Sequence, residues 1–218
     1  MTDDRSFALF LDVETTGLGG DDKIVSIGAI KLDAVKLSKG VLDFEPFHLV
    51  FDPGRKSHPK AEEVHGFDDW FLRHQDPFDD HASEIHRIAN GCELFVAHNA
   101  AFDLTFLERE FEACGLAMPA AERYCTMAAY RASGQGGSAS LSSVCQRLGL
   151  GRQRERHDAL HDAWLAMQVY LWLHKSPLYK TSFSAVADSG FQNLREVPPR
   201  PEGPLPRRKA RRREKALA

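Results

Sequence analysis

Residues 7–18 read FALFLDVETTGL, an apolar run that ends in two carboxylic acids. The apolar part is typical of a strand at the centre of a sheet, buried on both faces. Asp12 and Glu14 lie two residues apart, so the alternation of side chains along a strand places both on one face. A carboxylate in such a strand is costly to bury unless it is paired, hydrogen-bonded or bound to a metal. The stretch therefore predicts a central strand with a functional site at its end.

Outward from this strand, the chain predicts a mixed α/β fold. Alternating residues at 24–32 and 44–51 indicate two more strands, which we expect to be antiparallel neighbours joined by short turns. Short strands are also predicted at 93–97 and around 124–126. The spacing of apolar residues and the capping residues Asn99 and Gly115 predict helices. Their expected ranges are 59–65, 101–114, 141–148 and 158–174. We therefore expect a mixed five-stranded sheet flanked by helices.

The pattern fades after residue 180. Residues 197–206 contain five prolines, which prevent a regular helix or sheet ladder. Residues 207–218 contain seven Lys or Arg and one acid, so this tail carries +6 and the remaining chain carries −9. We expect one domain over residues 1–180, followed over residues 181–218 by a proline-rich linker and a disordered basic tail. The tail is either a solvated end or an electrostatic tether to an anionic polymer.

The overall composition indicates a globular protein rather than a membrane protein. The chain is 43% hydrophobic and 27% charged, which is ordinary for a soluble domain. No apolar run approaches the roughly 20 residues of a transmembrane helix, and residues 1–5 do not resemble a secretory signal. We therefore expect a cytoplasmic protein with no membrane partner. The four cysteines show neither a C-x-x-C pair nor the spacing of a zinc site.

Two further acids complete a set of four. Asp103 lies in the first turn of one predicted helix, and Asp162 lies among alanines that place it against the sheet. Four converging acids could hold two divalent cations about 3.5–4 Å apart, an arrangement that supports phosphodiester cleavage. Oxygen ligands of this kind suit Mg²⁺ or Mn²⁺. Taken alone, Asp12 could instead cap a turn, and Asp103 could be an acid that stabilises the helix dipole.

His157 precedes Asp162 by five residues. An imidazole ordinarily titrates near neutral pH, which suits it to take a proton from an attacking water molecule. A surface histidine at the start of a helix is the alternative. The position next to the fourth acid is what favours a catalytic role.

Three motifs stand in order along the chain. They read FLDVETTGL at 10–18, VAHNAAFD at 96–103 and HDALHDA at 157–163. Together they resemble the three exonuclease motifs of the DEDD superfamily, and the H-x-A-x-x-D form of the third is similar to that of the DEDDh branch. Segments 57–66 and 140–149 are also similar to the proofreading epsilon subunits of bacterial DNA polymerase III and their stand-alone relatives. The resemblance covers about residues 7–175 and implies an RNase H-like fold.

The same resemblance implies a two-metal 3′→5′ exonuclease with a defined set of site residues. The metal ligands would be Asp12, Glu14, Asp103 and Asp162, and His157 would be the general base. The residues expected to meet the terminal nucleotide are Thr15, Thr16, Gly17, Leu18, His65, Asn99 and Phe102. Phe102 could stack on a base or belong to the core, and Asn99 could both cap its helix and line the site. His98, Asp158 and His161 are expected to be structural or solvated.

Three functions are compatible with this interpretation. The first is a DNA exonuclease for proofreading or repair, which acts on single-stranded or frayed DNA 3′ ends and has a DNA polymerase subunit as a candidate partner. The second is an exoribonuclease that trims RNA 3′ ends, since a preference for the 2′-OH depends on a few contacts only. The third is a non-catalytic module of a polymerase complex. The complete set of acids and His157 favours catalysis, because a scaffold has no reason to keep five costly polar groups together.

Overall fold

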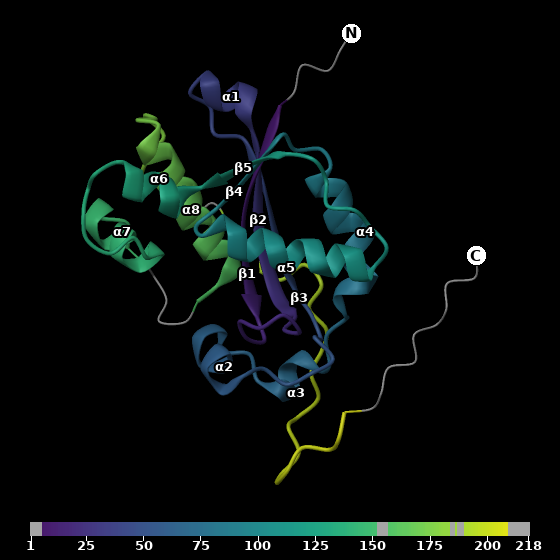
Figure 1. The fold of residues 1–218 in the computed structure, drawn as a ribbon. Helices are drawn as coiled ribbons and strands as arrows, with labels where there is room; N and C mark the ends of the chain where they lie inside the picture. The colour runs from purple at the N-terminus through teal and green to yellow at the C-terminus, as the bar shows by residue number, and fades with distance from the viewer. Residues whose placement is uncertain (1–5, 152–156, 184–185, 187–189, 209–218) are drawn as a thin grey trace.

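The computed structural model describes residues 6–151, 157–183, 186 and 190–208. Its strands form one sheet in the order β3–β2–β1–β4–β5 (Figure 1). The strands are β1 (Phe7–Thr15), β2 (Ile24–Asp33), β3 (Phe44–Val50), β4 (Leu94–Ala97) and β5 (Glu122–Cys125). The first three strands are antiparallel neighbours, whereas β4 is parallel to β1 and β5 is parallel to β4. The predicted mixed five-stranded sheet is confirmed.

Helices cover both faces of the sheet (Figure 1). On one face lie α4 (Phe78–Ala89) and α5 (Ala100–Ala113), and on the other lies α8 (Ala159–Leu173), with α6 (Thr126–Ala132) and α7 (Leu141–Leu148) beside it. Odd-numbered β1 residues such as Leu11 pack towards α4 and α5. The even-numbered Phe10 packs towards α8. Asp12 and Glu14 continue the even-numbered row, so β1 presents both acids to the face that α8 covers.

Three shorter helices lie at the two ends of the sheet (Figure 1). α1 (Ala34–Ser38) connects β2 to β3 at one end. α2 (Pro59–His65) and α3 (Asp69–Leu72) lie at the other end, where β1 finishes. α2 has proline in its first turn and ends at Gly66, whose φ of 77° is left-handed, as is common for a helix stop.

Most predicted elements agree with the structure, but four helices were missed. The ranges expected for α2 and α7 match, and those for α5 and α8 differ by one residue at each end. The helices that we did not predict are α1, α3, α4 and α6. α4 had a readable signal, because its buried residues Phe78, Ala82, Ile85 and Ala89 recur at three- and four-residue steps.

Residues 190–208 form no helix or strand, as their prolines predict, yet they contact the domain. The Asn193 side chain accepts from Val50 N at 3.0 Å and donates to Val50 O at 2.7 Å, along the free edge of β3. Farther on, Arg208 forms an ion pair of 2.7 Å with Asp69 on α3. These contacts differ from what we expected of a linker, whereas the domain boundary at residue 180 stays a prediction.

The predicted basic tail falls largely outside the described residues, since residues 209–218 are not among them. Within the parts of the chain that are described, no helix has the length and apolar character needed to cross a bilayer. The four cysteines are free thiols.

Candidate active site

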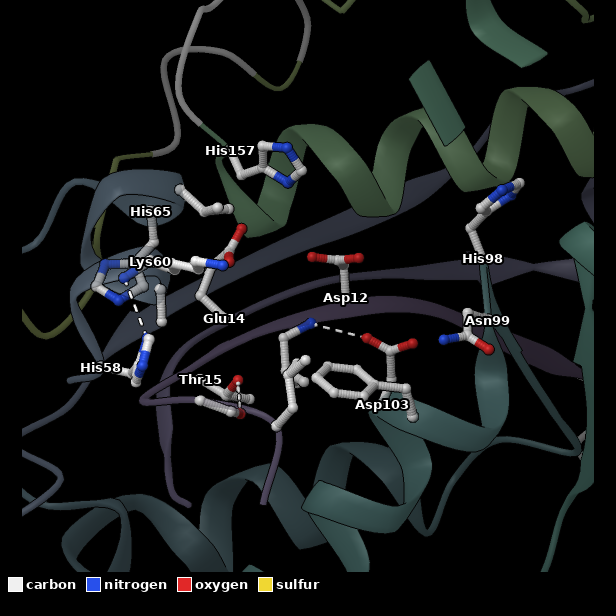
Figure 2. A pocket seen from close by; sticks show the side chains of 16 residues that line it. Asp12, Glu14, Thr15, His58, Lys60, His65, His98, Asn99, Asp103 and His157 are labelled. Carbon is white, nitrogen blue, oxygen red and sulfur yellow. Dashed lines mark hydrogen bonds between the residues drawn. The ribbon is translucent and has the colours of Figure 1, made fainter. Parts of the chain in front are cut away.

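A cavity of about 530 Å³ opens at the end of β1. Its walls come from β1 and the following turn, from α2, from the junction of β4 and α5, and from His157 (Figure 2). β1 extends beyond the last residue of β4, so the cavity lies at the carboxyl edge of two parallel strands, where open α/β sheets commonly bind ligands. All the predicted site residues line it except Thr16 and Asp162.

Three of the predicted catalytic groups form a compact cluster. Ligand atoms of Glu14, His157 and Asp162 all lie within 4.8 Å of one another. His157 Nδ1 is 3.3 Å from Asp162 Oδ2, and the His157 side chain is 41% exposed. Asp162 therefore belongs to the site although it is buried behind His157. Figure 2 shows the Asp12 carboxylate between those of Glu14 and Asp103.

Asp103 reaches the cluster from the first turn of α5. It is buried, and its Oδ1 accepts a hydrogen bond of 3.1 Å from the backbone N–H of Val13, between Asp12 and Glu14 in the chain. The pKa of Asp103 is raised to about 7, mainly by burial. The hydrogen bond from Val13 opposes this rise, and the charge of Asp162 adds to it. Closely spaced acids of this kind resist joint ionisation unless a cation neutralises them. The oxygen-rich donor set thus fits hard divalent cations.

Gly28 on β2 brings α8 against this cluster. It pairs with Asp12 in the β1–β2 ladder. A Cβ atom at Gly28 would collide with the backbone of Ala159 and Leu160. The start of α8 can therefore lie directly on the sheet, which sets Asp162 opposite β1. We did not identify Gly28 from the sequence, although a glycine inside a strand often marks the close approach of another backbone.

His157 lies between two elements that fix its backbone. Its N–H donates to the carbonyl of Val64, on α2, at 3.0 Å. The next residue, Asp158, caps α8 by accepting from the backbone N–H of His161 at 3.0 Å. His161 itself is buried and lies 4.5 Å from Phe183, between ring centroids. The cap formed by Asp158 and the ring contact of His161 are consistent with the structural roles that we expected, which stay predictions.

The family follows from the sequence of this chain. The RNase T exonuclease family model matches residues 9–170. The chain belongs to the RNase T/DEDDh exonuclease family. This exonuclease is 33% identical over 174 residues to the DNA polymerase III subunit epsilon of Escherichia coli (strain K12), a match over 75% of this chain and 69% of that protein. It is 32% identical over 175 residues to the same subunit of Pasteurella multocida (strain Pm70), over 75% and 66% of the two chains.

Solved structures show the same fold at lower identity. Exonuclease X in complex with 5′ overhanging duplex DNA has a TM-score of 0.59 and 22% identity, over 78% of this chain and 92% of that chain. Exonuclease I without ligand has a TM-score of 0.66 and 20% identity, over 79% of this chain and 43% of that chain. The predicted RNase H-like fold is confirmed. The family model and the similarity to epsilon subunits show that the chain is a 3′→5′ exonuclease of the DEDD type.

At the junction of β4 and α5, the exonuclease differs from one expectation. Asn99 occupies the N-cap position but has a φ of 90°, and its side chain makes no capping hydrogen bond. Asn99 therefore stands at the predicted N-cap position, but without the side-chain hydrogen bond of a cap. Asparagine tolerates this left-handed conformation, and the exposed side chain lines the cavity instead. The neighbouring His98 has ring nitrogens 2.9 Å from Thr126 Oγ1 and 2.8 Å from Ala139 O. These contacts are consistent with the structural role that we expected, and His98 also lines the cavity.

The turn after β1 presents some of its residues to the cavity. Thr15 donates its hydroxyl to Gly17 O at 2.7 Å, and Leu18 is 85% exposed. Thr16, by contrast, is fully buried, and its hydroxyl donates to Asp22 Oδ1 at 2.7 Å. Thr16 supports the turn, so its placement does not favour the direct substrate contact that we predicted.

Phe102 lies at the boundary between the core and the cavity, so its position is compatible with stacking on a base and with packing in the core. It lines the cavity, is half-buried and packs on Phe106 with ring centroids 4.8 Å apart. It can therefore contact a substrate from its position at the edge of the core.

The wall formed by α2 contains residues that we did not predict as site residues from the sequence. These are His58, Lys60, Ala61 and Val64. Among the described residues that line the cavity, Lys60 is the only Lys or Arg. The range of α2 was readable from the sequence, but the side of the helix that faces the cavity depends on where α2 packs in the fold.

Proposed function

We propose that this exonuclease removes nucleoside 5′-monophosphates from DNA 3′ ends in proofreading or repair, with two divalent cations, Mg²⁺ or Mn²⁺. The observation that carries the proposal is the cluster of Glu14, His157 and Asp162, whose ligand atoms lie within 4.8 Å of one another, beside the acids Asp12 and Asp103. DNA as the substrate is supported by the sequence similarity to epsilon subunits of DNA polymerase III. The fold that it shares with a DNA-bound exonuclease X is consistent with this.

Asp12, Glu14, Asp103 and Asp162 would hold the cations. When bound, the cations make a water molecule more acidic and offset the negative charge that develops on the phosphate. His157 is the group that accepts a proton from the attacking water, because its imidazole reaches the cluster and stays partly open to solvent. The Asp162 carboxylate, 3.3 Å from His157 Nδ1, holds the imidazole in its orientation towards the cluster.

The cavity supports a single-stranded or frayed 3′ end as the bound form. Its volume of about 530 Å³ lies within the range of about 300–1,000 Å³ that holds one small ligand. The exposed Leu18 and the half-buried Phe102 offer apolar contact to a base. A DNA polymerase subunit as partner and a cytoplasmic location are further proposals, which rest on the resemblance to epsilon subunits.

Hydrolysis of matched, 5′-labelled DNA and RNA single strands tests the proposal. The strands are incubated with Mg²⁺ or Mn²⁺ over a range of concentrations, and the released nucleotides are identified by chromatography. We expect cation-dependent release of 5′-monophosphates, faster from DNA than from RNA, and none with a folded Asp162→Asn control. Faster cleavage of RNA would assign the protein to RNA 3′-end trimming. Failure to cleave either strand would leave the non-catalytic module, which a pull-down with a polymerase subunit then tests.

A further inference from the structure

Residues 190–208, which we call the strap, lie outside the part of the chain that the family model matches. They run from the edge of the sheet past α3 (Figure 1). Along β3, the backbone N–H of Gln192 donates to His48 O at 2.9 Å, and the amide of Asn193 bonds to both backbone groups of Val50. The strap therefore takes the place that a further strand would have at this edge.

Beyond β3, the strap is held by α3. Trp70 donates its indole N–H to Pro198 O at 2.8 Å, and Arg73 donates from its guanidinium to Pro206 O, also at 2.8 Å. An extended proline-rich chain makes no internal hydrogen bonds, so its carbonyls are free to accept from side chains. The helix thus binds the backbone of the strap at two points.

Arg208 forms the last anchor of the strap. Its side chain is 16% exposed and lies between Asp52, which follows β3, and Asp69 on α3. The distance from Arg208 Nε to Asp69 Oδ1 is 2.8 Å. Burial by itself would raise the pKa of Asp69, but hydrogen bonds from Arg208 and Arg73 hold that pKa below its ordinary value. Loss of Arg208 would leave buried carboxylates with less compensation, so this residue fixes the end of the strap.

Phe191, near the start of the strap, connects it to the wall of the cavity. Its ring centroid lies 4.0 Å from that of His48 on β3 and 5.7 Å from that of Phe67, in the link between α2 and α3. Phe67 in turn stacks on His65 at 5.3 Å, and His65 lines the cavity. A continuous row of rings therefore joins the strap to the end of α2.

The α2 wall needs support of this kind. α2 has seven residues, of which only His65 is buried, and a helix of this length is not stable by itself in water. Its position therefore depends on what packs against it and against α3. The contacts of the strap described above fall on β3, on α3 and on Phe67, whereas the acids come from β1, α5 and α8.

We propose that the strap positions the α2 wall of the cavity, with Phe191 and Arg208 as its two main anchors, so that affinity for a 3′ end depends on this segment. Neither residue is among those that line the cavity, so both are positioning residues that act through Phe67 and α3. The inference rests on the proposed function, in which the cavity holds the 3′-terminal nucleotide.

The test uses variants of the full chain with matched controls. Arg208→Gln removes the last anchor, and Arg207→Gln removes the same charge from an exposed neighbour. Phe191→Ala removes the ring, and Leu194→Ala removes an apolar side chain that is 54% exposed. Steady-state kinetics in Mn²⁺ gives kcat and KM for each variant on a labelled dinucleotide and on a long single strand. The dinucleotide reports on the cavity, because it is too short to reach a distant basic segment.

We expect Arg208→Gln and Phe191→Ala to raise KM about threefold to tenfold on both substrates, with kcat unchanged. This size lies in the range that packed side chains transmit between sites. Phe191→Leu, which keeps most of the apolar volume, should recover part of the loss. Arg207→Gln and Leu194→Ala should leave KM for the dinucleotide unchanged. The inference is overturned if the two anchor variants match their controls, or if they lose kcat instead.

Two further comparisons separate the possible failures. Thermal unfolding shows which variants are folded, and if Phe191→Ala is not, Phe191→Leu and Arg208→Gln decide. A rise in KM on the long strand alone, equal for Arg208→Gln and Arg207→Gln, would show that Arg208 contributes only its charge and would contradict the positioning role. A wild-type protein that cleaves neither substrate contradicts the proposed function, whereas normal cleavage with unchanged KM in the folded anchor variants contradicts only the role of the strap.

Discussion

The two walls of the cavity are built in different ways. The wall that carries the acids belongs to the core: β1 is a central strand, α8 is buried over most of its length, and Asp103 is held against β1 by the Val13 hydrogen bond. The opposite wall is α2, of which only His65 is buried. Backbone hydrogen bonds connect this helix to the neighbouring segments. His58 N donates to Thr16 O at 2.7 Å, and His157 N donates to Val64 O at 3.0 Å.

This difference teaches that the chemistry and the binding of substrate depend on separate parts of the fold. Changes in the core wall should remove catalysis or stability, because the acids are placed by packing. Changes in the α2 wall should mainly alter KM. The predictions below test that division, from the largest expected effect to the smallest.

Replacing Asp103 or Asp162 by asparagine should reduce cleavage below detection. Each substitution keeps the shape of the side chain but removes a charge needed to hold a cation. Cleavage of a labelled strand in Mn²⁺ measures the effect, and circular dichroism verifies the fold. Activity within tenfold of the wild-type level in either folded variant would remove that residue from the metal site.

His157→Ala should lower kcat by about 10²–10⁴-fold, the usual contribution of a general base, with little change in KM. Steady-state kinetics on a short DNA strand measures both constants. His58→Ala is the matched control, since His58 also lines the cavity but lies away from the acid cluster. If the two variants lose activity equally, His157 has no special role in the chemistry.

Gly28→Ala should destabilise the protein by about 1–3 kcal/mol, the usual cost of overpacking a core, and should lower kcat. The added methyl group collides with the backbone of Ala159 and Leu160 and moves α8, with Asp162, away from β1. Urea denaturation gives the free energy of unfolding. Gly20→Ala is the control, because a Cβ atom there meets nothing within 4 Å. Equal stability of the two variants contradicts the close contact between β2 and α8.

The pH dependence of stability tests the buried acid of the core wall. Without divalent cations, the pKa of Asp103 is raised from 3.8 to about 7, so the folded state holds its proton more tightly than the unfolded state. The free energy of unfolding should therefore fall as the pH rises from about 4 to about 7. Urea denaturation in EDTA at several pH values measures this slope. Asp103→Asn should flatten it, and an unchanged slope in that variant would show that other groups are responsible.

Deletion of residues 209–218 should have the smallest effect. It removes five Lys or Arg and one acid. It keeps Arg208, which forms an ion pair with Asp69 on α3, the helix that follows α2 in the chain. We expect weaker binding of single strands and a shallower dependence on salt, with kcat unchanged. Fluorescence anisotropy at several salt concentrations measures both. An identical salt slope in the deletion variant would exclude the tether.

The sequence alone predicted the parts of the site that follow from local periodicity. The alternation of side chains along β1 places Asp12 and Glu14 on one face. The resemblance of the three motifs to a known family implies which distant acids join them. The range of α2 was indicated by Pro59 in its first turn, and that of α5 by its apolar spacing and by Asn99 and Gly115. α4 could have been found in the same way, because its apolar residues recur at helical steps. Such features depend on neighbours within one or two turns of the chain.

Only the tertiary structure decided which groups touch across the fold. Val13 and Asp103 are 90 residues apart in the chain, and the contact of Gly28 with α8 joins segments that are still farther apart. The left-handed conformation of Asn99 and the burial of Thr16 follow from how loops close against packed elements. These details are set by packing and hydrogen bonding between distant segments, because the pattern of residues along one segment carries no information about the backbone that will lie against it.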